Sequence, residues 1–495
     1  MSDEILINVT PTESRVALVE HGLLQEFYLE RRDLTSHVGN IYMGRVERVM
    51  PGMQAAFVDV GLARTAFLHA SDIMRRQTEL ADDEVERVVP PIASLVREGE
   101  EVLVQVTKDP LGTKGARLTT QLSIPSRCLV LLPHVDTIGV SARIEDDAER
   151  ERLRQLLGEL LAERGVTDRE GLGFILRTNA EGVEAEALQR DLEYLVRRWR
   201  SIQSDLAGAK PGQLIYEDLA LPFRSLRDLM HAGIERMRID HAPTLERAQR
   251  FAQAFYPDWV DRLEAYTGSS PLFDLYGVEG EIDRALSRTT PLKSGGYLCI
   301  DQTEAMTTID VNSGAFVGAS NAAETIFKTN LEAAQTVARQ LRLRNLGGII
   351  IIDFIDMDDE AHKRQVMRML QRALEADPAK TFVSELSQLG LVEMTRKRTT
   401  ESLEHRLCEP CQVCRGTGRI KSIETVCGEI FREIVRTVRQ FESGQLRVLA
   451  AAQVVERILE EHGATIGELA EQLNTDIRFQ ADRHYPQDQF DVVLL

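Results

Sequence analysis

The chain is short of three things: cysteine, long apolar runs and positive charge. Six of its 495 residues are cysteine, and three of the six lie between positions 408 and 414. A disulfide framework is therefore not expected, and a reducing compartment with a metal site fits better. Residues 1–9 lack the basic flank and long hydrophobic region of a signal peptide or membrane span, and other apolar stretches are strand-sized. The sequence predicts a soluble, cytoplasmic protein of several domains.

The formal net charge of −19 makes nucleic-acid binding possible only through local basic patches. A solvated charged face is the usual fate of such patches. The candidate patches are Arg31-Arg32, Arg45 with Arg48, Lys108 with Lys114 and Arg117, Arg197-Arg198 with Arg200, and Arg396-Lys397-Arg398.

Two short segments carry acids at the ends of predicted strands. In the segment 307–314, Asp310 and Asn312 point to the same side because side chains alternate along a strand. In the segment 347–354, Asp353 ends an apolar run typical of a strand buried on both faces.

The spacing between the two segments predicts one helix over residues 321–344. A strand–helix–strand unit returns the second strand beside the first, so Asp310, Asn312 and Asp353 can meet at one edge of the sheet. Such an all-oxygen site suits magnesium and phosphoryl chemistry. The alternative is that Asp310 begins a turn and Asp353 caps a helix starting near Asp358, and the residues alone leave both interpretations open.

Short strands with glycine corners, from Val38 to Thr107, predict a small five-stranded barrel of the oligonucleotide-binding kind. Phe57 and Phe67 can then stack on unpaired bases, and Lys114 can supply charge for phosphate. The alternative for both Phe side chains is packing in the barrel core. The preceding residues 5–30 predict a hairpin around His21-Gly22, too short to fold alone.

A further strand over residues 172–178 ends in Arg177 and Thr178, just before a predicted helix from about residue 184 to 200. An Arg and a hydroxyl beside a helix start can form a small phosphate pocket. On spacing alone, a salt bridge from Arg177 to a nearby Glu is the better interpretation.

Cys411 and Cys414 form a C-x-x-C followed by glycines, which is a zinc-knuckle spacing. A structural zinc takes four ligands, and no second pair follows. Either Cys408 and a distant group complete the set, or two chains each give two sulfurs to one ion, which predicts a dimer. A redox-active dithiol is the remaining alternative.

Taken together, these motifs resemble the RNase E/G endoribonucleases along essentially the whole chain. No long Pro- and Arg-rich C-terminal scaffold follows, so the chain is similar to the shorter members. The residues that carry the resemblance are the barrel strands, 176–178, 309–313, 351–357, the Cys-x-x-Cys-x-Gly-x-Gly run and 489–494.

The resemblance implies an α/β and α+β multidomain architecture. It consists of a split RNase H-like subdomain at 1–37 and 215–278, an OB-fold barrel of the S1 type at 38–125, a 5′-sensor at 126–214, a DNase I-like catalytic subdomain at 279–400, a zinc link at 401–416 and a small helical domain at 417–495.

The resemblance also implies roles for individual residues. Asp310 and Asp353 match magnesium ligands, and Asn312 matches the third polar group of the active site. Matched RNA-binding residues are Phe57, Phe67, Lys114 and Lys380, where relatives can carry Arg. Matched 5′-phosphate-binding residues are Arg177 and Thr178, with backbone contacts from Gly139 and Val140. Cys411 and Cys414 match the ligands of a zinc ion shared between two chains, with Cys408 as an extra thiol.

The implied function is magnesium-dependent cleavage of single-stranded, A/U-rich RNA to 5′-phosphate and 3′-hydroxyl ends, stimulated by a 5′-monophosphate. Implied roles are 5′-end maturation of 16S rRNA and mRNA turnover, in a cytoplasmic homodimer or tetramer. Two rival functions remain: a non-catalytic RNA-binding or ribosome-assembly factor, and a magnesium phosphoesterase acting on DNA or small phosphate esters.

Overall fold

The structure is a computed structural model with two compact units, Met1–Leu403 and Glu404–Leu495, each treated by itself below. It describes residues 3–32, 36–73, 90–110, 114–144, 146–163, 171–231, 233–314, 322–387, 389–398, 400–441 and 444–495. Among the helices in these ranges, none combines the length and apolar character that a membrane span needs.

The first unit begins with a sheet that joins the N-terminal hairpin to a segment more than 200 residues away. β1 pairs in parallel with β14, and the strand order is β15-β14-β1-β2-β3. His21 and Gly22 turn between β2 and β3 with φ of 53° and 79°, so the predicted hairpin is confirmed. Its elements are β1 (Asp3–Val9), β2 (Glu13–Glu20), β3 (Leu23–Arg31), α4 (Leu221–Asp228), β14 (Ile234–Ile239), α5 (Ala242–Phe255), β15 (Leu263–Ala265), α6 (Leu272–Leu275) and α7 (Val278–Leu286).

The next strands close into the predicted five-stranded barrel. The order β4-β5-β6-β8-β7 is closed by pairing of β7 with β4, and β13 adds to the outside of β4. Gly44 is required on β4 because an added Cβ would lie 2.6 Å from Cγ1 of Val58. Its elements are β4 (Ile41–Met50), β5 (Ala55–Asp59), β6 (Ala66–His69), α1 (Ile92–Leu95), β7 (Glu101–Lys108), β8 (Arg117–Thr119) and β13 (Leu214–Tyr216).

Between β8 and β13, a four-stranded sheet packs against two helices. The strand order is β11-β12-β10-β9, and the apolar side of α3 contributes Leu188, Leu192, Leu195 and Trp199 to its core. The elements are β9 (Ile124–Pro125), β10 (Leu129–Pro133), β11 (Ile138–Val140), α2 (Asp147–Glu163), β12 (Leu172–Leu176) and α3 (Ala185–Leu206).

The predicted acid-bearing segments lie in a six-stranded sheet of order β16-β17-β18-β19-β21-β20. Helices α8 and α9 pack on one face of this sheet and bury Ile350 and Ile352, whereas Ile349 is 48% exposed on the other. The prediction that the second acid strand is buried on both faces is therefore wrong. The elements are β16 (Thr289–Pro291), β17 (Tyr297–Gln302), β18 (Met306–Asn312), α8 (Ala322–Leu343), β19 (Gly348–Asp353), α9 (Glu360–Leu374), β20 (Thr381–Leu386) and β21 (Leu391–Arg396).

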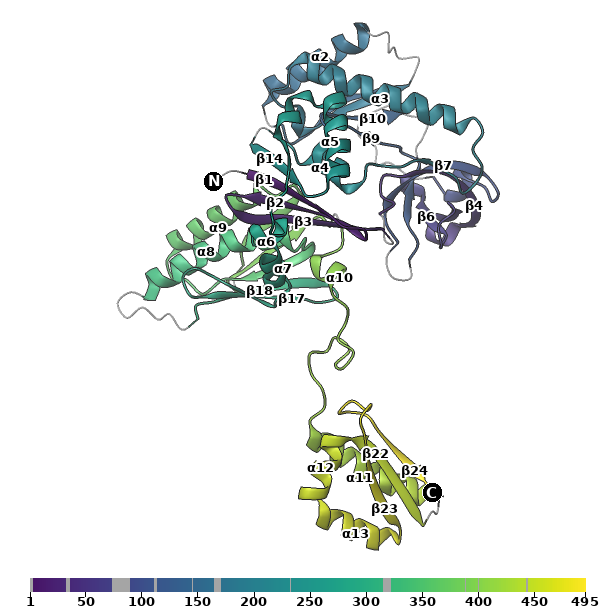
Figure 1. The fold of residues 1–495 in the computed structure, drawn as a ribbon, viewed down its shortest axis with the longest axis vertical. Coiled ribbons are helices and arrows are strands. Elements are labelled where there is room, and N and C mark those ends of the chain that lie inside the picture. The colour runs from purple at the N-terminus through teal and green to yellow at the C-terminus, as the bar shows by residue number, and fades with distance from the viewer. Residues whose placement is uncertain are drawn as a thin grey trace. The chain divides into compact units, whose positions relative to one another are not determined.

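Helix α8 also packs against the N-terminal sheet, so it lies between two sheets (Figure 1). Arg342 on α8 forms ion pairs with Glu26 at 2.7 Å and Glu20 at 3.0 Å, and the Nε of Arg339 donates to the carbonyl of Leu24 at 3.0 Å. Arg342 and Glu26 are buried, so this ion pair fixes the helix to strand β3.

The second unit contains a mixed three-stranded sheet of order β23-β22-β24 with helices packed around β22. The prediction of a small helical domain is therefore wrong, because three short strands form its centre. The elements are α10 (Leu403–Leu407), which begins at the boundary, α11 (Ile423–Phe441), β22 (Gln445–Ala451), α12 (Ala452–Glu461), α13 (Gly463–Leu473), β23 (Asp476–Asp482) and β24 (Phe490–Leu494).

Candidate functional site

The structure brings Asp310 and Asp353 side by side. β18 and β19 run parallel, and their register pairs Asp310 directly with Asp353. Neighbouring strands lie about 4.8 Å apart, so the two carboxylates project from adjacent positions. Both side chains are exposed on the face of the sheet that α8 and α9 leave open. The predicted return of the second strand beside the first is thus what the fold shows.

Three polar groups share this position. The side-chain amide of Asn312 donates to Oδ2 of Asp310 at 2.8 Å, which orients both side chains. Partial burial, together with the negative charges of Asp310 and Asp356, raises the pKa of Asp353. Mutual repulsion of carboxylates is what a bound cation offsets.

The alternative interpretation of these acids does not match the structure. Asp310 lies within β18 rather than in a turn. The cap of α9 is Asp359, whose carboxylate accepts from the backbone N–H of Ala361 at 2.7 Å. Asp353 therefore does not cap this helix.

Asn330, which was not among the residues predicted from the sequence, holds the loop after Asp353. Its side chain is fully buried on α8, donates to the carbonyl of Ile355 at 2.7 Å and accepts from the N–H of Ile355 at 3.1 Å. These two hydrogen bonds fix the backbone of Ile355, two residues beyond Asp353. The sequence places this Asn on the apolar side of a predicted helix, where an amide without a partner would be unfavourable. That position could have indicated a buried amide with hydrogen-bond partners.

The donor set fits magnesium, which is bound by one or two carboxylates and keeps several waters. In the described ranges, no group of three or more His, Cys, Asp or Glu side chains is placed to form a complete cage. Two carboxylates and an amide therefore resemble a hydrated magnesium site more than a site built only from protein ligands.

Phe57 and Phe67 lie outside the barrel core. They are directly paired on β5 and β6, with ring centroids 6.2 Å apart in an edge-to-face arrangement. Their neighbours Val58 and Leu68 are fully buried on the inner side, whereas both Phe rings are partly exposed. The alternative that these rings fill the core is therefore wrong. Lys114 is exposed in the segment leading into β8, which pairs with β6.

Arg177 is anchored through one nitrogen only. Its Nη1 donates to the carbonyl of Ser126 at 2.5 Å and to Asp228 at 2.8 Å. Its Nε and Nη2 make no hydrogen bond within the described ranges, so the side edge of the guanidinium remains available. The salt-bridge alternative is thus partly right, but the partner is an Asp from α4 rather than a nearby Glu.

Charged and polar side chains surround Arg177 and bond to one another. Burial would raise the pKa of Asp228, but the guanidinium groups of Arg227 and Arg177 outweigh burial and lower it. Asp191 is buried and accepts from the hydroxyl of Ser126 at 2.8 Å, which supports the turn that carries the carbonyl bound by Arg177.

The remaining 5′-pocket candidates lie close by. Thr178 follows Arg177 directly, and its hydroxyl makes no hydrogen bond within the described residues. Gly139 and Val140 lie on β11, paired with Ile175 and Leu176 of β12, which places them one strand away from the approach to Arg177.

Cys411 and Cys414 occupy a tight turn before α11. The N–H of Arg415 donates to the carbonyl of Cys411 at 2.7 Å, and the N–H of Thr417 donates to that of Cys414 at 2.9 Å. Hydrogen bonds from the N–H groups of Cys414 and Val413 lower the pKa of the Cys411 thiol, which favours the thiolate form that metals bind. Cys408 is also exposed.

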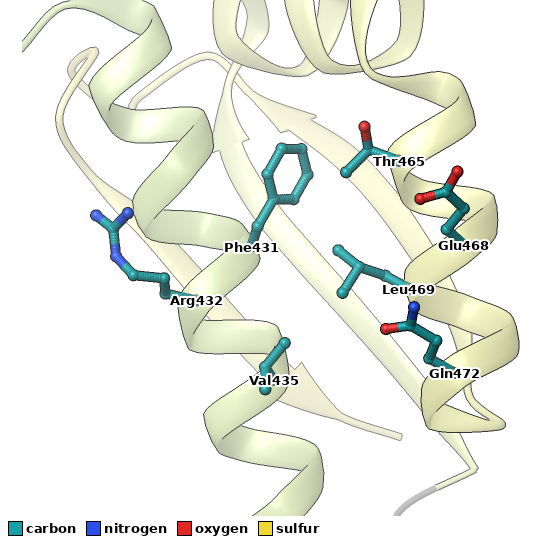
Figure 2. A pocket seen from close by; sticks show the side chains of 7 residues that line it. All are labelled: Phe431, Arg432, Val435, Thr465, Glu468, Leu469 and Gln472. Carbon is teal, nitrogen blue, oxygen red and sulfur yellow. The ribbon is translucent and has the colours of Figure 1, made fainter.

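A shallow pocket of about 400 Å³ between α11 and α13 contains none of these residues (Figure 2). Arg432 and Glu468 are its charged side chains, and Phe431, Val435 and Leu469 contribute apolar surface. It carries no carboxylate pair or thiol, so no chemistry is assigned to it.

Comparisons with known proteins show which family the chain belongs to. Residues 123–399 match the Ribonuclease E/G family, residues 36–120 the S1 RNA binding domain, and residues 410–494 the "RNase E/G, Thioredoxin-like domain". Ribonuclease G of Salmonella typhimurium is 51% identical over the whole of both chains, and Ribonuclease G of Haemophilus influenzae is 49% identical over 99% of each. Ribonuclease E of Haemophilus influenzae is 37% identical over 96% of this chain and 50% of its own length. A family model matching more than half of the chain and full-length relatives at this identity show that the chain belongs to the ribonuclease E/G family.

Proposed function

We propose that the protein is a magnesium-dependent endoribonuclease of the ribonuclease G type that cuts single-stranded, A/U-rich RNA. Full-length relatives named Ribonuclease G support the endoribonuclease class. The single observation that carries the chemistry is the register pairing of Asp310 with Asp353 on an open sheet face.

In this proposal, Asp310 and Asp353 hold the ion, and Asn312 orients Asp310 and the water shell. Magnesium, when bound, supplies an activated water and neutralises charge at the scissile phosphate. The carboxylates stand on an exposed face, where a phosphodiester can reach them without opening the core. The products carry a 5′-phosphate and a 3′-hydroxyl, and no side chain need act as the base.

RNA reaches this centre through the barrel. Phe57 and Phe67 offer partly exposed rings on neighbouring strands, and base stacking on such rings does not depend on sequence. Lys114 and Lys380 are exposed and supply positive charge for phosphates. These lysines provide local positive charge in a chain whose formal net charge is −19.

We assign the sheet containing β1 and β14 to an RNase H-like subdomain, the sheet containing β18 and β19 to a DNase I-like subdomain, and the Cys411–Cys414 turn to a zinc link. The zinc is shared by two chains in a cytoplasmic homodimer, with pairing into tetramers as a further step. Roles in 16S rRNA 5′-end maturation and mRNA turnover complete the proposal.

A 5′-monophosphate binds at Arg177. The free Nε and Nη2 edge can hold two phosphate oxygens in the bidentate manner that guanidinium groups favour. The Thr178 hydroxyl is adjacent, and the backbone of Gly139 and Val140 borders the site. Because Nη1 is already fixed by Ser126 and Asp228, little freedom is lost on binding.

Replacing Arg177 by Lys is expected to remove the preference for 5′-monophosphate RNA. Lys keeps the positive charge but lacks the planar guanidinium group that can donate two hydrogen bonds side by side. The ratio of kcat/KM for 5′-monophosphate over 5′-hydroxyl RNA should therefore fall by about tenfold, which corresponds to the loss of one charge-assisted hydrogen bond. Cleavage of 5′-hydroxyl RNA should stay within about twofold of wild type, because no 5′-phosphate contact is involved. A variant that loses both activities equally would point to a structural role.

Asn330→Ala should lower both stability and cleavage. It leaves the partly buried N–H and carbonyl of Ile355 without partners, which costs about 1–3 kcal/mol in the free energy of unfolding. A displaced Asp353 should lower kcat by about 10- to 100-fold. Urea unfolding and single-turnover cleavage measure the two effects. Gln335→Ala, at an exposed position on the same helix, is the matched control and should change neither.

One assay tests the proposed function as a whole. Mass-resolved products are compared for 5′-hydroxyl and 5′-monophosphate RNA and for the equivalent DNA, with and without magnesium. Cleavage of RNA only with magnesium, leaving 5′-phosphate ends, is the expected result. Binding without cleavage would favour a non-catalytic RNA-binding factor, and cleavage of DNA alone would favour a phosphoesterase.

A further inference from the structure

The open face of the catalytic sheet continues well beyond the two carboxylates. Moving along β19 from Asp353 toward its start, the strand register aligns a row of four side chains across four strands. These are Met306 on β18, Ile349 on β19, Thr395 on β21 and Phe382 on β20.

This row is unusually exposed for apolar side chains. Phe382 is 70% exposed, Ile349 48% and Met306 36%. Their chain neighbours Ile350, Val383 and Met394 face α8 and α9 in the core, so strand alternation fixes the row on the other face. An exposed apolar row on a folded sheet marks a binding surface more often than a packing defect.

A basic row follows directly. The backbone N–H of Lys397 donates to the carbonyl of Lys380 at 2.9 Å, which places these residues opposite each other just beyond Phe382 and Thr395. Strand alternation puts both side chains on the open face. Both are exposed, and neither forms an ion pair with a residue that the structure describes.

The open face therefore changes character along the strands from acidic to apolar to basic. Asp353 and Ile349 are four residues apart on one strand, so about 13 Å separates the carboxylates from the apolar row. A few nucleotides of an extended strand span this distance. A ligand that fits must offer flat apolar rings and anionic groups together, and single-stranded RNA does so.

We propose that Phe382, at the end of the row that runs from Met306 through Ile349 and Thr395, is a base-stacking platform for single-stranded RNA on the same sheet face as the cleavage centre. Lys380 and Lys397 hold the phosphates that flank the stacked base. Exposed aromatic side chains on a sheet are a known means of binding unpaired bases. The proposal rests on the proposed function, because the RNA is taken to be the strand that Asp310 and Asp353 cut.

The test compares Phe382→Ala, Phe382→Trp and wild type on 5′-monophosphate RNA oligonucleotides of graded length. Loss of one stacked base should raise KM about tenfold, with kcat within about twofold of wild type. Phe382→Trp should restore KM. Some of these oligonucleotides are shortened at the end that crosses the platform and therefore lack the stacked base. Wild type and Phe382→Ala should bind these short RNAs equally. Phe441→Ala is the matched control, because it also removes an exposed Phe ring, one that is 56% exposed and lies in the second unit.

Crosslinking gives an independent measurement. A 4-thiouridine placed a few nucleotides from the scissile bond should crosslink to the peptide containing Phe382, and mass spectrometry identifies the site. An unchanged KM for Phe382→Ala on every RNA length would overturn the platform. A change in the oligomeric mass of Phe382→Ala without a change in KM would also overturn the platform, because it would mark the row as a protein interface. If wild type itself fails to cut RNA, the proposed function fails rather than the platform alone.

Discussion

Asp353→Asn is expected to abolish RNA cleavage and leave RNA binding intact. The substitution keeps the side chain's size but removes one of the two charges proposed to hold magnesium, and a catalytic metal ion contributes several kcal/mol of transition-state stabilisation. Cleavage should fall by roughly a thousandfold. The barrel rings and the lysines are untouched, so the Kd for uncleaved RNA should stay within about threefold of wild type, a tolerance of well under 1.4 kcal/mol. Single-turnover cleavage and fluorescence anisotropy measure the two quantities.

The matched control is Asp301→Asn. Asp301 lies on the neighbouring strand β17, on the same face of the sheet, and pairs with Arg288 at 2.6 Å on the surface. An exposed pair of this kind contributes about 0–1 kcal/mol, so activity should be close to wild type. Wild-type cleavage by Asp353→Asn would remove the two-carboxylate centre. Loss of RNA binding in Asp353→Asn would instead indicate a misfolded protein.

Replacing both Cys411 and Cys414 by Ser should dissociate the proposed zinc-linked dimer. A shared ion needs two thiolates from each chain, and structural zinc binding contributes on the order of 10 kcal/mol, so few other contacts replace it. Mass photometry should show monomers, and metal analysis should show zinc falling from one ion per two chains to none.

Cys408→Ser distinguishes between the two possible sets of zinc ligands. One set takes Cys411 and Cys414 from each of two chains, and the other includes Cys408 and a distant group. If the Cys411–Cys414 pair is sufficient, this variant keeps its zinc and remains a dimer. Zinc loss in Cys408→Ser would place that thiol among the ligands. A double variant that stays dimeric without zinc would contradict the shared ion altogether.

The acid centre could be predicted because it depends on local order along the chain. The strands bearing Asp310 and Asp353 are joined by a single helix, and such a unit brings its two strands into parallel contact. The five-stranded barrel was predictable for a similar reason, since its strands follow one another closely. In the same way, alternation along β5 and β6 places Phe57 and Phe67 opposite the buried Val58 and Leu68.

Features that depend on distant partners could not be predicted. Asp228, which pairs with Arg177, lies 51 residues away on another element. The pairing of β1 with β14 joins still more distant segments, and only the family resemblance, not the residue pattern, indicated that residues 1–37 and 215–278 belong together. The apolar run at Ile349 wrongly predicted a strand buried on both faces, because the sequence does not show that the apolar side chains on one side of β19 remain exposed. The strands of the second unit were missed because amphipathic helices surround them.

Helix α8 has a consequence for how this protein can be shortened. It supplies Asn330 to the loop after Asp353 and, through Arg342, is clamped to a strand within the first 31 residues. A fragment starting at residue 279 would retain every proposed magnesium ligand. It would, however, expose to water the buried side chain of Arg342 and the side of α8 that packs on β3. The chemistry is thus inseparable from the N-terminal hairpin, and trimming or remodelling the start of the chain should damage a centre more than 270 residues downstream.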